Sequence, residues 1–391
     1  MEYIHTKFAD KDGVLCFSTE EMVASLEAVN SDPDARNISL FSTDVSGMYP
    51  ALDIEVIAKW LAEEYLQSDL EILNIDHLEL ALYLAVTNNQ TELDNLGLTE
   101  VVHTRVASSG ARPGVTTKEV LDRDEKTVSL FHPPLRAPTQ IEARKMFAVA
   151  LESLVLASMN NHIYSFAGEF RKQSKGGAIG NVLTGSLGAF AMVIWSRGFK
   201  KNLNYAMTEF ESFKHFLLKI YVDDGNQICS TLPPGSRLIN GKVRILEEKV
   251  EEDKNIPGDI RTANILTEIG NSVCHFIVLT VDTPSSNSSG WMPILDLQVR
   301  VDSDIVEYMF YKKKVTTPYL ILSRSALPNK IKWASLVQEG VRRLLNTRRQ
   351  LDWDTVKADI LSESSWAMKI SSYSAKFRLE VTQAAIVTYE N

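Results

Sequence analysis

The feature that most constrains this chain is a strand-like run that ends in two adjacent carboxylates. The apolar residues 216–220 lead into Tyr-Val-Asp-Asp at 221–224, and Gly225 then turns the chain back through residues 226–228. A strand, a tight turn and a returning strand predict a β-hairpin with both acids at its tip. Successive side chains of a strand point to opposite faces, so the turn is what would bring both carboxylates to one divalent ion. An ordinary solvated hairpin tip is the alternative interpretation.

A second acid, upstream, strengthens the functional interpretation. Residues 38–45 form another strand-like run, which contains Asp44, and Gly-Met-Tyr-Pro at 47–50 then leads into a helical pattern at 53–66. If two strands that carry these acids lie side by side, Asp44, Asp223 and Asp224 surround one point. This is the arrangement for two-metal phosphoryl transfer, in which ions about 3.5–4 Å apart stabilise the attacking and the leaving oxygen.

A glycine-rich segment lies between these two strands in the sequence. Residues 173–181 read Gln-Ser-Lys-Gly-Gly-Ala-Ile-Gly-Asn and open an apolar helix at 182–199. Glycine allows the backbone to approach a ligand closely, and a helix N-terminus favours anions. A plain joint between a loop and a helix is the alternative interpretation.

In this order, the segments 44–49, 173–181 and 221–224 resemble the palm motifs of a reverse transcriptase. The segments 293–299, 311–313 and 319–349 are similar to the hairpin and basic helix of Penelope-like retroelements. The resemblance spans residues 37–349. It implies an α+β right-hand polymerase: a palm with an antiparallel sheet and helices, partial fingers and a helical, thumb-like C-terminal region. The implied activity is that of an RNA-directed DNA polymerase from a retroelement-derived protein.

The resemblance also implies a role for each site residue. Asp44, Asp223 and Asp224 would be the catalytic residues and would hold two Mg²⁺ ions, with Mn²⁺ as an alternative. Val45 would add a backbone carbonyl, and the ring of Tyr49 would exclude a 2′-hydroxyl. The incoming deoxynucleoside triphosphate and the template would lie along Gln173, Lys175, Gly176, Gly177 and Gly180.

The charge of the chain is distributed unevenly. Its net charge is −9, yet residues 1–110 hold 5 Lys and Arg against 20 Asp and Glu, whereas residues 311–391 hold 14 against 7. We therefore expect the basic end to hold an RNA template and a DNA primer through phosphate contacts. The residues expected to do so are Lys312, Lys313 and Lys314 beside the hairpin, and Arg342, Arg343, Arg348 and Arg349 on two turns of one helix. A solvated basic helix face is the alternative interpretation.

The expected organisation has five segments. They are residues 1–87 with the first Asp motif of the palm, an inserted polar, fingers-like region at 88–138, the palm with both later motifs at 139–283, a primer-grip-like hairpin at 284–325 and a basic helical region at 326–391. Periodicity predicts helices at 20–30, 53–66, 77–87, 139–160, 241–254, 326–345, 355–362 and 367–379. Strands are expected at 37–43, 101–106, 128–131, 162–166, 169–172, 273–281, 294–301 and 305–311.

Three isolated cysteines, Cys16, Cys229 and Cys274, argue against a zinc site and against a disulfide framework. They favour a reducing compartment, the nucleus or the cytoplasm. We expect no membrane partner, because no run of about 20 apolar residues occurs.

The 43 residues before Asp44 contain few cations for a triphosphate clamp, namely Lys7, Lys11 and Arg36. We therefore expect an N-terminally truncated fingers region, completed by the insertion or by a partner protein. Two alternatives follow for the function. One is a degenerate reverse transcriptase that binds nucleic acid with weak or no catalysis, and the other is an RNA-dependent RNA polymerase.

Overall fold

The computed structural model describes residues 10–68, 101–106, 126–131, 140–160, 162–173, 175–178, 182–311, 320–349 and 352–391. The chain forms two compact units. The first comprises residues 1–12, 46–197 and 274–277, and the second comprises residues 13–45, 198–273 and 278–391. The architecture is α+β, with antiparallel sheets and helices at the C-terminus.

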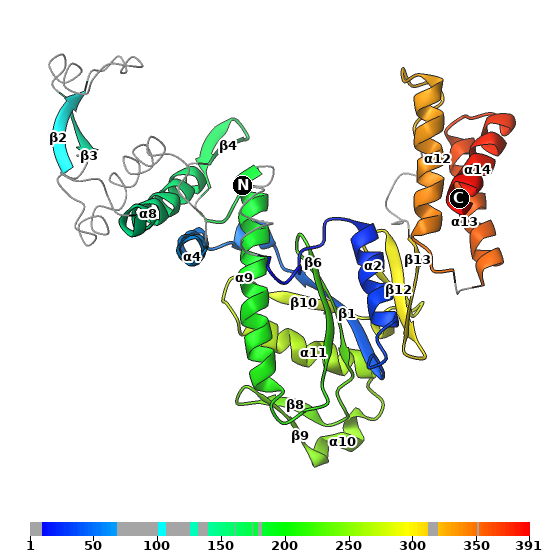
Figure 1. Cartoon of the computed structure of the whole chain (residues 1–391), viewed down its shortest axis with the longest axis horizontal. Helices are drawn as coiled ribbons and strands as arrows, with labels where there is room; N and C mark the ends of the chain where they lie inside the picture. Colours follow the sequence, from blue (N-terminus) through cyan, green and yellow to red (C-terminus); the bar gives the residue numbers. More distant parts are fainter. Residues whose placement is uncertain are drawn as a thin grey trace. The chain divides into compact units, whose positions relative to one another are not determined.

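The second unit is built on a four-stranded antiparallel sheet. Its strand order is β10 (Leu279–Asp282), β1 (Ile38–Val45), β7 (Asp224–Ser230) and β6 (His215–Tyr221). The helix α11 (Gly258–Asn271) packs on β1 and β10 (Figure 1). The first four residues of β1 are buried, because this strand has a neighbour on each edge and a layer on each face.

A smaller sheet and one helix form a further layer of this unit. The sheet consists of β11 (Met292–Ile294), β12 (Leu297–Asp302) and β13 (Ile305–Phe310), and the helix α2 (Thr19–Asn30) packs on it. Their shared core includes Met22, Leu26, Leu40, Leu297 and Val299. Leu40 and Asp44 are four residues apart in β1, so their side chains point to the same face of the four-stranded sheet. The small sheet therefore packs on the face that also carries Asp44. Ser18 caps α2 by accepting a bond from the amide of Glu21 at 3.2 Å, and the helix predicted at 20–30 is confirmed.

A hairpin and a short helix correct one sequence prediction. Residues 241–254 are not one helix: β9 (Lys242–Ile245) pairs with β8 (Ser236–Ile239), and α10 (Glu247–Asp253) follows. The reason is the turn at Asn240 and Gly241, where both residues have positive φ, at 50° and 77°. Arg237 of β8 donates hydrogen bonds to both carboxylate oxygens of Asp253, which ties α10 to the hairpin. The same hydrogen bonds lower the pKa of Asp253 to about 2.

Three helices form the C-terminal end of this unit: α12 (Asn329–Leu345), α13 (Trp353–Ile370) and α14 (Ala375–Glu390). Their common core includes Leu336, Val337, Val341, Met368 and Val381. The helical character was predicted, but the helix boundaries at 362, 367 and 379 were wrong. α13 continues to Ile370, and the chain breaks where Ser372 has a φ of +70° and Ser374 caps α14.

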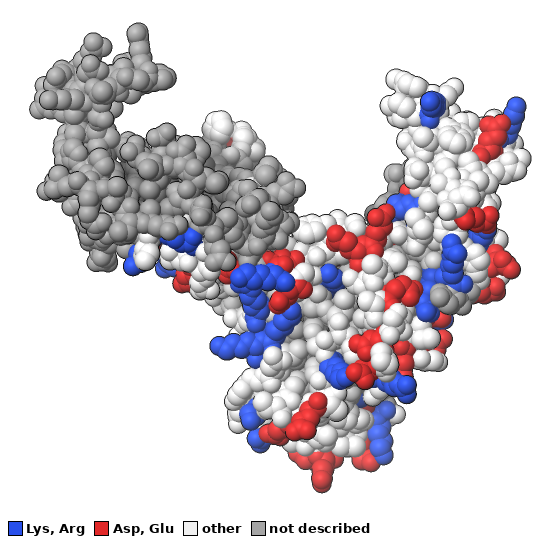
Figure 2. All heavy atoms as spheres, in the orientation of Figure 1, with Lys and Arg blue, Asp and Glu red and all other residues white. Residues whose placement is uncertain are grey.

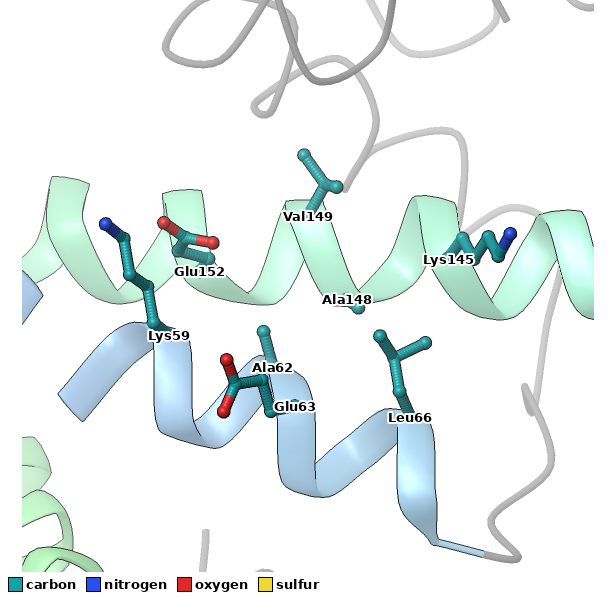
Figure 3. Close-up of a pocket in the computed structure, with 8 residues that line it drawn as sticks. All are labelled: Lys59, Ala62, Glu63, Leu66, Lys145, Ala148, Val149 and Glu152. Carbon is teal, nitrogen blue, oxygen red and sulfur yellow. The ribbon is translucent and has the colours of Figure 1, made fainter. Parts of the chain in front are cut away.

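The first unit contains α3 (Met48–Ala51) and the packed pair α4 (Ile54–Gln67) and α8 (Gln140–Met159). The helix α9 (Val182–Ala206) begins in it. Both long helices of the pair were predicted. A cavity of about 500 Å³ lies between them (Figure 3). Two lysines, Lys59 and Lys145, and two glutamates, Glu63 and Glu152, line it with opposite charges, so it has no net cationic field for phosphate.

Two antiparallel hairpins also belong to this unit. They pair β2 (Val101–Val106) with β3 (Lys126–Phe131) and β4 (Ile163–Phe166) with β5 (Glu169–Lys172). Strands were predicted in all four places, and the pairing of β2 with β3 was not. The helix predicted at 77–87 lies outside the described residues. Among the residues that the structure describes, no helix is long and apolar enough to cross a membrane.

Other strand predictions need correction in the second unit. Of the strand expected at 273–281, only β10 forms, since residues 274–277 belong to the first unit. The strand expected at 294–301 is interrupted by a two-residue turn at Leu295 and Asp296, between paired Ile294 and Leu297. The helix α11 was not predicted at all.

Candidate active site

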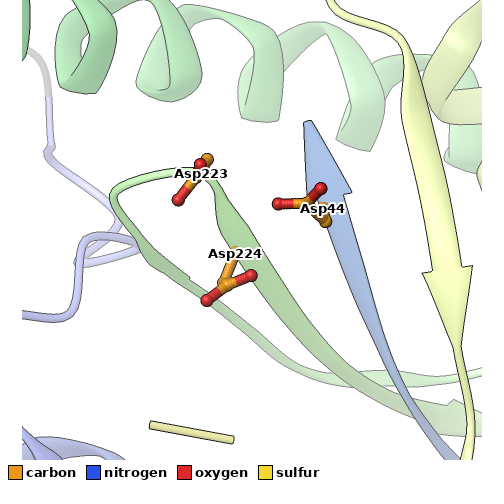
Figure 4. Close-up of side chains that lie close together, drawn as sticks. All are labelled: Asp44, Asp223 and Asp224. Atoms are coloured by element: carbon orange, nitrogen blue, oxygen red, sulfur yellow. The ribbon is translucent and has the colours of Figure 1, made fainter. Parts of the chain in front are cut away.

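Three carboxylates converge at one end of the four-stranded sheet. Asp44 in β1 and Asp224 in β7 are directly opposite each other in the antiparallel register, and Asp223 lies in the adjacent turn. One oxygen from each of the three lies within 4.8 Å of the others, and the side chains face a common space (Figure 4). The sequence prediction that these acids meet on neighbouring antiparallel strands is confirmed.

The turn between β6 and β7 brings the second acid of the pair into this cluster. Tyr221 pairs with Asp224, which leaves Val222 and Asp223 as a two-residue turn. Val222 has a φ of +60°, a conformation that is uncommon for a β-branched residue and costs free energy. The amide of Val45 donates to the carbonyl of Asp223 at 3.3 Å, which holds the turn against the end of β1. The turn therefore replaces the strand alternation that would direct Asp223 away from Asp224.

Gly225 allows the two acid-bearing strands to approach each other. The hydroxyl of Thr43 donates to the carbonyl of Gly225 at 3.0 Å. A Cβ at position 225 would lie 2.7 Å from that hydroxyl oxygen, closer than ordinary contacts allow. The Gly in the sequence motif is thus required by packing between β7 and β1.

The electrostatics of the cluster favour a cation. Burial, together with the negative charge of Asp44, raises the pKa of Asp223 above its ordinary value. Asp44 itself is exposed, and the other two acids are half-buried, so an ion can reach them from solvent. Carboxylate oxygens are the ligands that hard divalent cations prefer, and the donor set therefore fits Mg²⁺ or Mn²⁺.

A cavity of about 270 Å³ adjoins two of these acids, Asp44 and Asp224. Its other walls come from the neighbouring strands and from the β11–β12 hairpin: Ser42, Thr280, Val281, Asp282, Pro293 and Leu295. Sequence reasoning did not identify the contribution of β10 to this wall. The available signal was polar alternation in β10: Thr280 lies opposite Asp44 in the register, and Asp282 lies opposite Ser42.

In the first unit, Tyr49 and the glycine-rich motif lie together. The amide of Gly177 donates to the carbonyl of Tyr49 at 2.8 Å. Gly176 has a φ of +71°, and a Cβ there would lie 2.4 Å from the carbonyl oxygen of Pro50. The side chain of Tyr49 is half-buried, with its ring close to Gly188 of α9. The two motifs are therefore joined through the backbone, and glycine is needed at the joint.

The other predicted substrate residues have the following positions. The side-chain amide of Gln173 donates to the carbonyl of Lys175 at 2.9 Å, and Lys175 is exposed. Gly180 lies outside the described residues, and so do Lys312, Lys313 and Lys314. The contacts of this group with a nucleotide or with nucleic acid remain predictions.

The four arginines of the basic end do not lie on one helix, which corrects the sequence prediction. α12 ends at Leu345, before Arg348 and Arg349. Arg342 and Arg343 both bond to Glu339, and the side chain of Arg343 is only 2% exposed. Arg348 bonds to Glu27, and Arg349 donates to the hydroxyl of Tyr389.

These arginines join parts of the fold to one another. Buried Arg343 is not accessible to phosphate, because its guanidinium packs over the ring of Phe310 and pairs with Glu339. In the view of Figure 2, basic and acidic side chains alternate over the C-terminal helices and the small sheet, without a continuous basic strip. The excess of basic residues in the sequence of this region is thus partly used inside the protein.

Comparisons with known protein sequences do not assign the chain to a family. No protein-family model matches it, and no curated protein matches its sequence. The chain has structural similarity over 99% of its length to telomerase from Candida albicans in complex with a fragment of telomeric RNA, at 11% identity and a TM-score of 0.46. It is also similar over 96% of its length to apo telomerase from Candida tropicalis, at 13% identity and a TM-score of 0.35.

The telomerase from Candida tropicalis with the same kind of RNA fragment matches 99% of this chain, at 11% identity and a TM-score of 0.38. The chain spans about half the length of these proteins: 51% of the Candida albicans telomerase, 51% of the apo Candida tropicalis telomerase and 49% of the Candida tropicalis telomerase with RNA. All three TM-scores are below 0.5, so these similarities alone do not indicate a function.

Proposed function

We propose that this chain is a reverse transcriptase domain, an RNA-directed DNA polymerase that uses two-metal nucleotidyl transfer. The observation that carries the proposal is the register pairing of Asp44 with Asp224, with Asp223 beside them within 4.8 Å. The motif order that the sequence shares with reverse transcriptases supports it. The proposal includes that the chain belongs to the Penelope-like subgroup and derives from a retroelement.

In this proposal the four-stranded sheet is the palm, the β11–β12 hairpin is the primer grip and α12–α14 form the thumb. Asp44, Asp223 and Asp224 would hold the divalent ions, which lower the pKa of the primer 3′-hydroxyl and neutralise charge on the triphosphate. The carboxylates orient the reacting groups because two of them are fixed on paired strands and the third on a strained turn. The cavity beside Asp44 and Asp224, which Pro293 and Leu295 also line, would receive the primer terminus.

Tyr49 would supply the preference for deoxynucleotides. The backbone of Tyr49 is bonded to Gly177 of the glycine-rich motif and its side chain is half-buried, so we expect a sugar that lies against that motif to meet the ring. A side chain in that position excludes the extra oxygen of a ribonucleotide by its volume, which is discrimination by steric repulsion.

Primer extension tests the proposal. The purified chain is given a DNA primer on an RNA template with Mg²⁺ or Mn²⁺ and deoxynucleoside triphosphates, beside Asp224→Asn and the exposed surface variant Glu248→Gln. We expect templated extension by wild type and by Glu248→Gln, and a loss of about 10²- to 10⁴-fold in Asp224→Asn, because metal-held charge stabilisation is worth several kcal/mol. Binding of the primer–template without extension in any condition would contradict the proposal and favour a non-catalytic derivative.

A further inference from the structure

The wall of the cavity beside the acids is attached to the C-terminal helices by an ion pair. Leu295 lines this cavity with Asp44 and Asp224, and it is the first of the two turn residues between β11 and β12. Its φ is +53°, a left-handed conformation that side chains other than glycine seldom adopt. Such a conformation persists only where the surroundings hold it in place.

Two contacts hold the next residue of this turn. The carbonyl of Asp296 accepts a bond from the amide of Tyr311 at 2.7 Å, which closes the turn against the end of β13. The carboxylate of Asp296 accepts a bond from the guanidinium of Arg342 in α12. The first contact lies within the small sheet, so Arg342 is what joins this turn to the helices.

The guanidinium of Arg342 is itself fixed from two further directions. Its Nε and Nη2 donate to Glu339 at 2.9 and 3.1 Å. Its Cζ lies 5.2 Å from the ring centre of Phe310, the last residue of β13. Three partners hold the planar guanidinium of Arg342 in one orientation. A lysine ammonium in its place would keep the charge but only part of this orientation.

The end of α12 is also attached to β13 independently of Arg342. The amide of Phe310 donates to the hydroxyl of Thr347 at 3.1 Å, and the amide of Arg348 donates to the carbonyl of Tyr308 at 3.0 Å. Loss of Arg342 therefore leaves the helix docked on the small sheet. What changes is the restraint on the turn at Leu295 and Asp296.

From this arrangement we propose that Arg342 is a positioning residue, which acts through Asp296 to hold the Leu295 wall against the catalytic acids. The role rests on the proposed function, because it matters for catalysis only if primer extension takes place at these acids. Both partners of the ion pair are partly exposed, at 39% and 50% of their side-chain area. Such a pair contributes little to overall stability, so its effect is expected on the geometry of the site.

The first test uses hydrogen exchange in the full-length protein without substrate. Arg342→Gln and Asp296→Asn should each speed exchange of the amides at 294–297, with little change in melting temperature. The matched control is Arg244→Gln, which removes an arginine of β9 that forms a partly exposed ion pair with Glu209 at 3.4 Å. This control should leave exchange at 294–297 as in wild type. Unchanged exchange at 294–297 in Arg342→Gln would overturn the proposal.

The second test measures kcat and KM for primer extension in the same variants. We expect kcat to fall on the order of 10- to 100-fold in Arg342→Gln and in Asp296→Asn, with KM for the nucleotide nearly unchanged, because small misplacements cost about this much. Arg342→Lys should recover most of the rate. The double variant should be no slower than either single variant, since both changes break one interaction. A double variant with the product of the two single losses, or an equal loss in Arg244→Gln, would overturn it.

The two tests separate the failure of this inference from the failure of the proposed function. If wild type extends no primer, the proposed function fails, and the exchange measurement still decides whether Arg342 restrains the turn. If wild type extends primers and Arg342→Gln retains the wild-type kcat, the polymerase proposal stands and the positioning role is wrong.

Discussion

Asp44 and Asp224 face each other as register partners on the antiparallel strands β1 and β7. Directly opposite like charges destabilise a strand pair, and a cation bound between the carboxylates would offset this repulsion. The third acid, Asp223, adds to this repulsion within 4.8 Å. Repulsion among such closely spaced carboxylates is what a bound divalent cation would relieve.

This cost leads to a prediction for Asp223→Asn. Burial and the charge of Asp44 raise the pKa of Asp223, so the ionised form is disfavoured in the folded protein relative to the unfolded chain. The contribution of this group to stability is therefore greatest at low pH and is lost as the pH rises through its raised folded pKa. At pH 7 with EDTA, the variant should melt at a higher temperature than wild type.

The same variant should respond less to added Mg²⁺. A ligand that binds only the folded state raises the melting temperature, and this rise requires the complete carboxylate cluster. Thermal melts of both proteins with EDTA and with a Mg²⁺ series measure both effects. A variant that is less stable than wild type in EDTA would show that Asp223 is a structural residue.

The close approach of β1 and β7 gives a prediction for Gly225→Ala. The new Cβ would lie 2.7 Å from the hydroxyl oxygen of Thr43, and overpacking of this kind costs about 1–3 kcal/mol. The added Thr43→Ala change removes the clashing atom, so the double variant should recover part of the stability. Chemical denaturation of the two single variants and the double variant measures this coupling. Losses that simply add in the double variant would mean that the two residues do not clash.

Sugar discrimination gives a prediction for Tyr49→Ala. The ring is half-buried and lies close to Gly188, with its backbone bonded to Gly177. Its removal should raise the incorporation of ribonucleotides relative to deoxynucleotides by at least about tenfold, a difference of about 1.4 kcal/mol in transition-state binding. The measurement is kcat/KM for matched ribo- and deoxynucleotides in single-nucleotide extension. An unchanged ratio would identify Tyr49 as a packing residue of the first unit.

The basic end gives a prediction about salt dependence. Each phosphate contact contributes about 0.9 to the slope of log affinity against log salt for a duplex. Arg343 is buried between Glu339 and Phe310, so Arg343→Gln should lower the melting temperature and leave the salt slope of binding to an RNA–DNA hybrid unchanged. A flatter slope in this variant would show that Arg343 leaves its buried position to contact phosphate.

The sequence allowed the acid cluster and its strands to be predicted because these features are local. Asp44 and the pair at 223–224 each lie at the end or turn of an apolar strand. The turn itself is at Val222 and Asp223, and Gly225, which the sequence predicts in the turn, lies in β7. The helix α2 was likewise predictable from its cap at Ser18 and its buried positions Met22, Leu26 and Val29. Period and turn chemistry were sufficient for these elements.

The errors have physical reasons that depend on tertiary context. The turn at Leu295 has no glycine to mark it, because contacts with Tyr311 and Arg342 hold it in place. The sequence predicts phosphate contacts for Arg342 and Arg343, because it does not show that Glu339 and Phe310 enclose Arg343. The cavity wall is completed by β10, which pairs with β1 although the paired residues are more than 230 positions apart in the sequence. Such a distant pairing cannot be predicted from local sequence patterns.

We expect Asp44, Asp223 and Asp224 together to hold divalent metal, and a titration with Mn²⁺ followed by electron paramagnetic resonance measures this binding. The concentration of free Mn²⁺ is measured in solutions of wild type, Asp44→Asn and the surface control Glu248→Gln, each at pH 7 with a primer–template and a nucleotide. Wild type and the control should bind Mn²⁺ equally, and Asp44→Asn should bind it at least about tenfold more weakly, because one carboxylate ligand of the cluster is lost. Equal Mn²⁺ binding by Asp44→Asn and wild type would mean that these carboxylates do not hold the metal.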